Sequence, residues 1–252
     1  LELINRDRIV RAADLVERLG VSMETIRRDL EELEKAGNLR RVYGGAVLGT
    51  IYSPEPSYYN REVTRAAQKR AIAAAVYNLI EDEDTLFLDG GTTLMEVARC
   101  IAAGNKRVTV ITNAVQLSCE VVKNEFCGAI LLGGALTRGE PLTSGAIASS
   151  DLMHFHANKI ILGAAGVSLR YGVTDHSFVI GSLKREMISR ADQVICVADF
   201  SKFNQTAANC ICPTSNLNVL VTDWLTDDAV CGQYTSAGVR VIKAPEPRSF
   251  NL

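Results

Sequence analysis

The sequence of 252 residues lacks an excess of charge of either sign, since 27 Lys and Arg stand against 29 Asp and Glu. A protein that coats DNA nonspecifically through bulk charge needs a basic excess, so this class is excluded. Residues 1–50 are balanced as well, with nine basic and nine acidic side chains. Any binding to nucleic acid must therefore depend on where individual basic side chains stand.

The sequence also lacks a cysteine motif for metal or redox chemistry. Its seven cysteines are an odd number, none forms a C-x-x-C pair, and most stand in apolar runs. We therefore expect reduced thiols in a cytoplasmic protein. Cys210 and Cys212 could bind a metal or sense redox state, but a structural role is favoured. His154 and His156 would share one face of a strand without an evident third ligand, so we expect no metal and no cofactor.

An apolar run long enough to span a membrane is missing too, so we expect no membrane partner. The chain opens on Leu1, inside an element and without a signal-peptide pattern, so we expect that a few residues precede it. Its length allows one large domain or two. Two of its six prolines stand within residues 50–60, which predicts a linker between a domain at 1–49 and a domain at 61–252.

Residues 21–33 predict a helix with one apolar face, because Ile26, Leu30 and Leu33 recur at helical spacing. Ser22 stands at the N-cap position. Residues 12–19 predict a second amphipathic helix, and Gly20 makes the turn between the two. This order of helix, turn and helix is typical of a helix-turn-helix motif.

The polar face of the 21–33 helix carries Thr25, Arg27 and Arg28. Paired arginines near the N-terminal end of a helix suit the major groove of DNA. The alternative is an ordinary surface helix with solvated charges. Residues 39–47 predict a hairpin with a Gly-Gly turn, and Arg40 and Arg41 on its first strand suit phosphates or the minor groove.

Two runs, TIRRDL at residues 25–30 and RRVYGGAV at residues 40–47, resemble the DNA-binding domain of the DeoR family of bacterial transcription regulators. The resemblance implies a winged helix-turn-helix that binds double-stranded operator DNA. The side chains expected at that interface are Ser22, Thr25, Arg27, Arg28, Arg40 and Arg41.

Beyond the linker, residues 61–79 predict a helix, and apolar strands then alternate with helices. We expect strands at 85–88, 108–111, 129–132, 159–162, 193–198 and 217–221. Such alternation is typical of an α/β fold, a Rossmann-like and mostly parallel sheet covered on both faces. Ligands of these sheets bind at the carboxyl ends of the strands.

Residues 89–93 follow the first of these strands and open a helix, which makes an anion site from backbone N–H groups and the helix dipole. The loop lacks the lysine of a nucleotide P-loop. An ordinary N-cap turn is the alternative. The residues expected around a ligand are Asp89, Gly91, Thr92, Thr93, Thr112, Asn113, Gly134, Gly166, Asp175 and Lys202.

The segments DGGTT at 89–93, GVTD at 172–175 and DFSKF at 199–203 resemble, in order, the DeoR family's sensor domain, whose fold is similar to ribose-5-phosphate isomerase. The resemblance implies a phosphorylated sugar as effector, with its phosphate on residues 89–93. Lys202 would supply a cation, while Asp175 and Asn113 would bind hydroxyls. Lys184 is a further candidate unless it faces solvent.

The predicted function is repression of a sugar-catabolism operon by a homo-oligomer, a dimer or a tetramer, that a phosphorylated sugar releases from DNA. The alternatives are a sugar-phosphate isomerase with a DNA-binding arm, and a sheet used only for oligomerisation. Ala164 and Ala165 stand where such isomerases tend to carry an acidic residue, although Asp175 and Glu186 remain possible bases. We therefore expect no enzyme activity and no catalytic residue.

Overall fold

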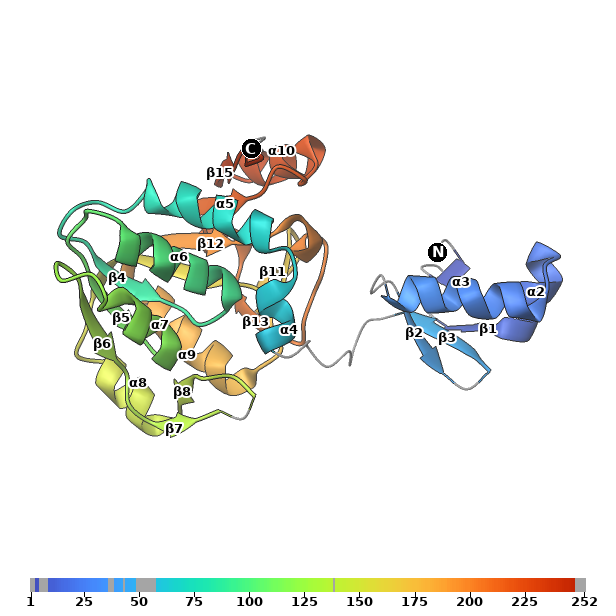
Figure 1. Cartoon of the computed structure of the whole chain (residues 1–252), viewed down its shortest axis with the longest axis horizontal. Helices are drawn as coiled ribbons and strands as arrows, with labels where there is room; N and C mark the ends of the chain where they lie inside the picture. The colour runs from blue at the N-terminus through green and yellow to red at the C-terminus, as the bar shows by residue number, and fades with distance from the viewer. Residues whose placement is uncertain are drawn as a thin grey trace, which may run out of the picture. The chain divides into compact units, whose positions relative to one another are not determined.

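The computed structural model describes residues 3–4, 9–35, 39–42, 44–48, 58–137 and 139–247. The chain divides into two compact units, Leu1–Glu55 and Pro56–Leu252, drawn in Figure 1. Several predicted segments lie outside the described residues: most of the helix tail at 1–5, the turn at 36–38, Tyr43 and most of the linker at 50–60.

The N-terminal unit packs two helices on a small antiparallel sheet. The helices are α2 (Ala12–Leu19) and α3 (Met23–Lys35), and the strands are β1 (Ile9–Arg11), β2 (Leu39–Val42) and β3 (Gly45–Leu48). The strand order is β1-β3-β2. The predicted helix-turn-helix and hairpin are therefore confirmed, whereas β1 was not predicted.

Local hydrogen bonds fix where α2 ends and where α3 begins. Gly20 ends α2 in the left-handed region, with φ 64°, and its N–H donates to the Val16 carbonyl at 2.9 Å. The Ser22 hydroxyl accepts the Thr25 N–H at 3.1 Å, which confirms the predicted N-cap of α3. Ile26 and Leu30 of α3 are buried in the core of this unit.

The C-terminal unit is built on a parallel sheet that contains seven strands among the described residues, in the order β15-β14-β12-β9-β4-β5-β6. Six of them match the predicted strands within two residues at each end. Their bounds are β4 (Thr85–Leu88), β5 (Thr109–Thr112), β6 (Gly128–Leu131), β9 (Ala157–Gly163), β12 (Ala191–Val197), β14 (Val219–Thr222) and β15 (Arg240–Lys243).

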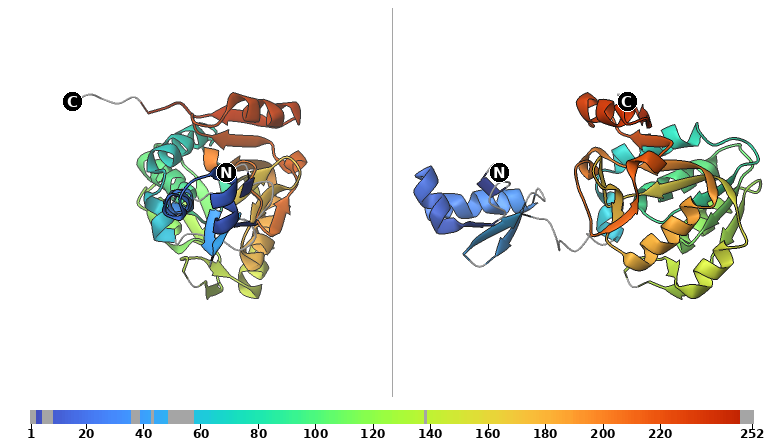
Figure 2. Two further views of the ribbon diagram at one scale, coloured as in Figure 1. Left: turned by 90° about the vertical axis from the view of Figure 1, so that its right-hand side faces the viewer. Right: turned by 180° about the vertical axis from the view of Figure 1, so that it is seen from behind.

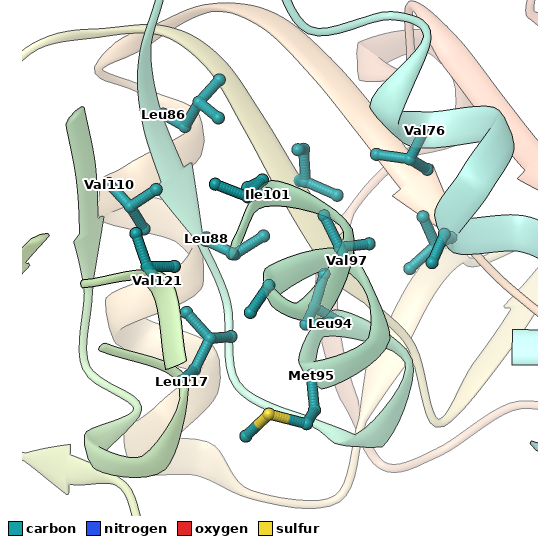
Figure 3. Close-up of a cluster of buried hydrophobic side chains, with 14 of the residues drawn as sticks. Val76, Leu86, Leu88, Leu94, Met95, Val97, Ile101, Val110, Leu117 and Val121 are labelled. Atoms are coloured by element: carbon teal, nitrogen blue, oxygen red, sulfur yellow. The ribbon is translucent and has the colours of Figure 1, made fainter. Parts of the chain in front are cut away.

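Alternate strand residues face two separate cores. Leu86 and Leu88 pack with side chains of α5 (Ala66–Tyr77), α6 (Thr92–Ala103) and α7 (Val115–Val121), as Figure 3 shows in part. Phe87, between them, packs in the other core with α8 (Ala146–Leu152), α9 (Phe178–Ile188) and α10 (Asp228–Ser236). Helices α8 and α9 cover that second face (Figure 2, right). The sheet is thus buried on both sides, as its apolar strands require.

The predicted helix at 61–79 is in fact two helices. α4 (Tyr58–Val63) begins within the predicted linker, and α5 follows after Arg65, which has φ 55°. A non-glycine residue in the left-handed region marks a turn that the Ala-rich composition does not reveal. The prediction of one continuous helix was wrong.

Two short antiparallel sheets were not predicted. One joins β10 (Gly166–Ser168), β11 (Gly172–Asp175) and β13 (Asn209–Cys212), and the other joins β7 (Ala135–Leu136) and β8 (Thr143–Ser144). The strand proposed for His154 and His156 was wrong, because both residues lie in the turn between α8 and β9. No group of three or more metal-ligating side chains occurs among the described residues.

The path of the chain changes direction between β4 and β9. From β4 the chain proceeds outward through β5 and β6, and it then returns to β9 on the other side of β4. The two neighbours are tied at their amino ends, where the buried Lys159 ammonium lies 2.6 Å from the Asp84 carboxylate. A crevice at the carboxyl ends of such a strand pair is the expected ligand position. None of the described helices is both long and apolar enough to cross a membrane.

Candidate functional site

The outward face of α3 presents the basic side chains predicted for DNA. Arg27 and Arg28 are exposed, on the side of the helix away from Ile26 and Leu30. Thr25 is half-buried, and its hydroxyl lies 2.9 Å from that of Ser22. Ser22 and Thr25 therefore shape the start of α3, while the two arginines are accessible to a partner.

The strand β2 is held against α3 by Arg41. Its backbone N–H donates to a Glu34 carboxylate oxygen at 2.7 Å, and its guanidinium lies 3.7 Å from Glu31. The Arg41 side chain is 41% exposed, so this ion pair is weak and can be exchanged for a phosphate contact. The side chain of Arg40 lies outside the described atoms.

In the C-terminal unit, a buried charge cluster lies where β4 and β9 end. Asp89 is 1% exposed, and one of its carboxylate oxygens accepts the Gly163 N–H at 3.1 Å. The Lys184 ammonium of α9 lies 2.8 Å from that oxygen and 2.6 Å from Asp175 of β11. The alternative that Lys184 faces solvent is wrong, and Lys184 joins two predicted site residues.

The charges of this cluster are largely matched internally. Burial would lower the pKa of Lys184, but Asp89 and Asp175 together raise it, so the ammonium keeps its proton. Burial would raise the pKa of Asp175, yet Lys184 lowers it below the ordinary value. For Asp89, burial outweighs Lys184 and the pKa rises. Lys184 is therefore engaged with carboxylates, and it orients the site instead of offering a spare cation.

The helix α6 begins beside this cluster. Gly91 precedes it with φ 129°, and Thr92 is buried while Thr93 is half-buried. The Met95 N–H donates to the Gly91 carbonyl at 3.0 Å, whereas the amides before it are in the first turn, where a helix offers no acceptor. These amides and the helix dipole make a position that favours an anion.

Asn113 follows β5, next to Asp89 along the same edge of the sheet. Its side-chain N–H donates to the Thr143 carbonyl at 2.9 Å, which fixes the orientation of the amide. The other side-chain atom, Oδ1, is buried and has no hydrogen-bond partner. A buried oxygen of this kind normally has a donor, so Asn113 can accept a hydrogen bond from a ligand.

Three further predicted residues have packing roles. The Thr112 hydroxyl accepts the Ala114 N–H at 3.0 Å and is fully buried. A Cβ on Gly134 would overlap the Ser144 carbonyl, and one on Gly166 would overlap Gln205.

Lys202 lies on the short helix η1 (Phe200–Lys202), within electrostatic range of Lys69. Lys69, which was not predicted as a site residue, is buried.

Family models match both units of the chain. Residues 1–51 match the "DeoR-like helix-turn-helix domain", and residues 64–224 match the "DeoR C terminal sensor domain". The chain belongs to the DeoR family. It is therefore a DNA-binding transcription regulator, as the arrangement of α3 and the hairpin predicts.

Similar DeoR-family proteins match along almost their whole length. The chain is 34% identical to the transcriptional repressor AccR of Agrobacterium fabrum over 224 residues, which are 88% of this chain and 86% of that protein. It is 34% identical to the transcriptional repressor GlcR of Bacillus subtilis, covering 89% and 86%. The regulator YulB of Bacillus subtilis is 32% identical and covers 97% and 94%.

A weaker likeness of fold joins the sensor domain to enzymes. Ribose 5-phosphate isomerase A from Neisseria gonorrhoeae aligns with a TM-score of 0.41 and 12% identity, over 54% of this chain and 52% of that chain. Such a likeness says nothing about catalysis. Of the two possible bases, Asp175 is paired with Lys184, and a Glu186 carboxylate oxygen accepts the Ser149 hydroxyl at 3.2 Å.

Proposed function

We propose that this DeoR-family protein represses a sugar-catabolism operon and that a phosphorylated sugar, bound at the carboxyl ends of β4, β5 and β9, releases it from DNA. The observation that carries the proposal is the unpartnered buried oxygen of Asn113 beside the start of α6. An acceptor that needs a donor suits a sugar hydroxyl, and amides that need an acceptor suit a phosphate.

Within that site, the first turn of α6 holds the phosphate through its amides and through the hydroxyls of Thr92 and Thr93. Asn113 accepts a hydroxyl of the sugar. The cluster of Asp89, Asp175 and Lys184 keeps the strand ends and α9 in place around the ligand. AccR and GlcR are named as repressors, which supports repression as the mode of regulation here.

On the DNA side, Arg27 and Arg28 contact base edges and phosphates in the major groove, and the hairpin contacts the backbone with Arg40 and Arg41. Two copies bind two half-sites of a near-palindromic operator in the cytoplasm. We assign their association to the C-terminal units. There the outer strand β6 has an unpaired edge in the described structure, with Ile130 and Leu131 exposed.

The effector releases DNA because it favours an arrangement of the two DNA-binding domains that fits the half-sites poorly. A coupling of about 1–3 kcal/mol between the two sites is typical of such regulation. Each ligand can shift the equilibrium only by the difference in its affinity for the two arrangements.

The test is a gel shift with the purified full chain and the DNA upstream of its own gene, repeated with a panel of hexose and pentose phosphates. We expect one phosphosugar to release the DNA, and its unphosphorylated parent to leave the complex intact. Thr93→Ala should retain DNA binding and need a higher concentration of that phosphosugar. Thr235→Ala, at an exposed position of helix α10, is the matched control and should behave like wild type.

Two results would contradict the proposal. In the first, no phosphosugar alters the DNA complex. In the second, the unphosphorylated sugar releases DNA as well as its phosphate does.

A further inference from the structure

The two outer strands of the parallel sheet differ in charge. β15, at one edge, carries Arg240 and Lys243, and the Lys243 ammonium lies 2.6 Å from the Asp228 carboxylate. β6, at the other edge, has no charged side chain and no proline, and its register with β5 is unbroken. No described strand pairs with the outer side of β6. Edge strands that remain in solvent normally carry charge, proline or a bulge, so β6 has the properties of a strand that pairs.

The backbone of β6 directs alternate residues toward β5 and toward the free edge. The N–H groups of Gly128 and Leu132 donate to carbonyls of β5 and of the residue before it, at 2.9 and 2.8 Å. Ala129 and Leu131, which alternate with these residues, therefore direct their N–H and C=O groups to the free edge. A second strand at this edge would find donors and acceptors at the spacing of its own.

The surface around this edge is apolar and almost without charge. Residues 126–150 hold two charged side chains, although charged residues make up 22% of the sequence. Six large apolar residues on β6 or close to it in the chain or the fold are nevertheless between 37% and 67% exposed: Val122, Phe126, Ile130, Leu131, Leu136 and Ile147. At about 200 Å² of surface for each residue, they expose roughly 600 Å². A stable dimer takes about 800 Å² from each partner, so these residues provide most of what a second copy needs.

These apolar side chains lie on both faces of the sheet. Ala129 packs in the core that α7 covers, and Leu131 points the same way because side chains alternate along a strand. Ile130 points to the other face. There Ile147 of α8 lies beside the end of β6, since a Cβ on Gly133 would be 3.0 Å from its Cγ2 atom. Figure 1 shows β6 as the outermost strand, so a partner strand at this edge would be covered by apolar side chains from both faces.

We propose that the β6 strands of two copies of this chain pair antiparallel at this edge, so that their two sheets become continuous. The edge is complementary to itself. About a two-fold axis at Ile130, Ala129 of one copy lies opposite Leu131 of the other, and these residues exchange both of their outward hydrogen bonds. Ile130 meets its own counterpart in the closer, non-hydrogen-bonded position. The inference rests on the two copies that the proposed function places on the operator.

The same axis brings unlike ends of the edge together. Antiparallel pairing places the amino end of one strand beside the carboxyl end of the other. Phe126, which precedes β6 in one copy, then lies beside the turn at Gly133 and Gly134 in the other, where Ile147 is exposed. This turn has no side chains of its own, so it leaves room for an aromatic ring.

The end of β6 is one residue away from the proposed effector site. The Thr143 hydroxyl donates to the Leu132 carbonyl at 2.6 Å, and the Thr143 carbonyl accepts the Asn113 side-chain N–H at 2.9 Å. A ligand that bonds to Asn113 therefore acts on a residue that also holds the end of β6. This contact gives the effector a short route to the arrangement of the two copies.

One pair of variants tests the pairing by disrupting it. Ile130→Lys places two like charges opposite each other at the axis, which opposes association. In the single chain, the long side chain reaches solvent from an edge strand, so the fold should be kept. Leu225→Lys is the matched control, because Leu225 is also an exposed apolar residue but follows β14, on the far side of the sheet.

Sedimentation velocity of the full chain, over a range of protein concentrations, measures the association. We expect wild type to self-associate. Ile130→Lys should have half the wild-type mass where wild type is fully associated, with the dissociation constant of this contact raised about 100-fold or more. Leu225→Lys should stay within about fivefold of wild type. Circular dichroism checks that both variants are folded.

Disulfide trapping tests the register with milder substitutions, in a background with serine at the exposed Cys119 and Cys210. Ile130→Cys puts two thiols in a non-hydrogen-bonded pair, whose Cα atoms are about 4.5 Å apart and within reach of a disulfide. Ala129→Cys is the matched control, since its counterpart lies farther along the other strand, beyond that reach. After oxidation with diamide, we expect Ile130→Cys to run as a covalent dimer and Ala129→Cys as a monomer.

Two outcomes overturn the inference alone. If Ile130→Lys associates like wild type, the copies meet through another surface. If Ile130→Cys is trapped no more than Ala129→Cys, the strands do not pair in this register. If wild type stays monomeric at every concentration, the inference fails together with the two-copy part of the proposed function, and the β6 edge is left for another protein. These measurements contain no phosphosugar, so release from DNA by the effector is judged separately.

Discussion

The two units of the chain place the side chains of their proposed binding sites in opposite ways. In the N-terminal unit, Arg27 and Arg28 are exposed on α3, and the core lies behind them. In the C-terminal unit, Asp89 and Asn113 are each 1% exposed. An exposed side chain can change partners without disturbing the core, whereas a buried polar group must keep its partners. In the first unit the side chains proposed for recognition are therefore separate from the core, whereas in the second unit the proposed ligand-binding side chains are part of it.

The largest expected effect is on stability, and it tests the buried charge cluster of the C-terminal unit. Lys184→Met leaves Asp89 and Asp175 buried without their cation, which should lower the free energy of unfolding by about 3–5 kcal/mol. Urea unfolding followed by fluorescence measures it, because the single tryptophan, Trp224, belongs to the C-terminal unit. Lys123→Met, which removes an exposed pair with Glu120, should change stability by less than about 1 kcal/mol. Equal stability of the two variants would show that the cluster does not hold the unit together.

The next largest effect is on operator binding, and it tests an exposed arginine of the N-terminal unit. Arg28→Ala should weaken operator binding about 10- to 100-fold, because a base or phosphate contact by arginine contributes about 1–3 kcal/mol. The thermal unfolding of the protein and its response to phosphosugar should stay as in wild type, since Arg28 is exposed. Gel shifts at fixed salt measure the affinity. A large loss of stability in this variant would contradict the view that Arg28 is not needed for folding.

Features set by local sequence patterns could be predicted from the sequence, whereas features set by tertiary contacts could not. The apolar stripe of α3, the cap at Ser22 and the glycine turn of the hairpin are local patterns, and they were predicted correctly. The apolar strands β4, β5 and β9 were also found, because burial on both faces makes their apolar runs continuous.

Other features depend on tertiary contacts. The strands β10, β11 and β13 pair with one another across the chain, and their three or four residues carry no distinct period. Lys69 stands in an Ala-rich helix and has the appearance of a solvated charge, whereas the fold buries it beside Arg61. Lys184 was similarly ambiguous, because its carboxylate partners are Asp89, just after β4, and Asp175 of β11.

A pH profile sharpens the comparison further, because a buried cation titrates where an exposed arginine does not. With a pKa of about 8 in the free protein, Lys69 loses its proton as the pH rises through that value. The phosphate stays dianionic throughout, since its second pKa is about 6. The affinity of wild type for the phosphosugar should therefore fall above pH 8, by up to about tenfold per pH unit.

Titrations from pH 7 to pH 9.5 measure this slope. Lys69→Arg should remain charged over the whole range and give a flat profile. A profile with the same slope in both proteins would assign the titration to another group.

The smallest expected effect is at the start of α3, where folding and recognition meet. Ser22→Ala removes the acceptor of the Thr25 N–H and should cost about 1 kcal/mol of helix stability. Ser22→Asp should keep the cap but place a negative charge near the DNA, so it should retain stability and weaken operator binding. Hydrogen exchange of the α3 amides and gel shifts measure the two properties. If both variants bind DNA like wild type, Ser22 lies away from the interface.

The central strand pair of the sheet has an evolutionary consequence. Side chains tie β4 to β9 at both ends, through Lys159 and Asp84 at one and through Asp89 and Gly163 at the other. A register fixed in this way cannot slip when neighbouring loops mutate. Selection for a new metabolite can therefore exchange loop residues around an unchanging pair of strands, and one scaffold can serve operons for many different sugars.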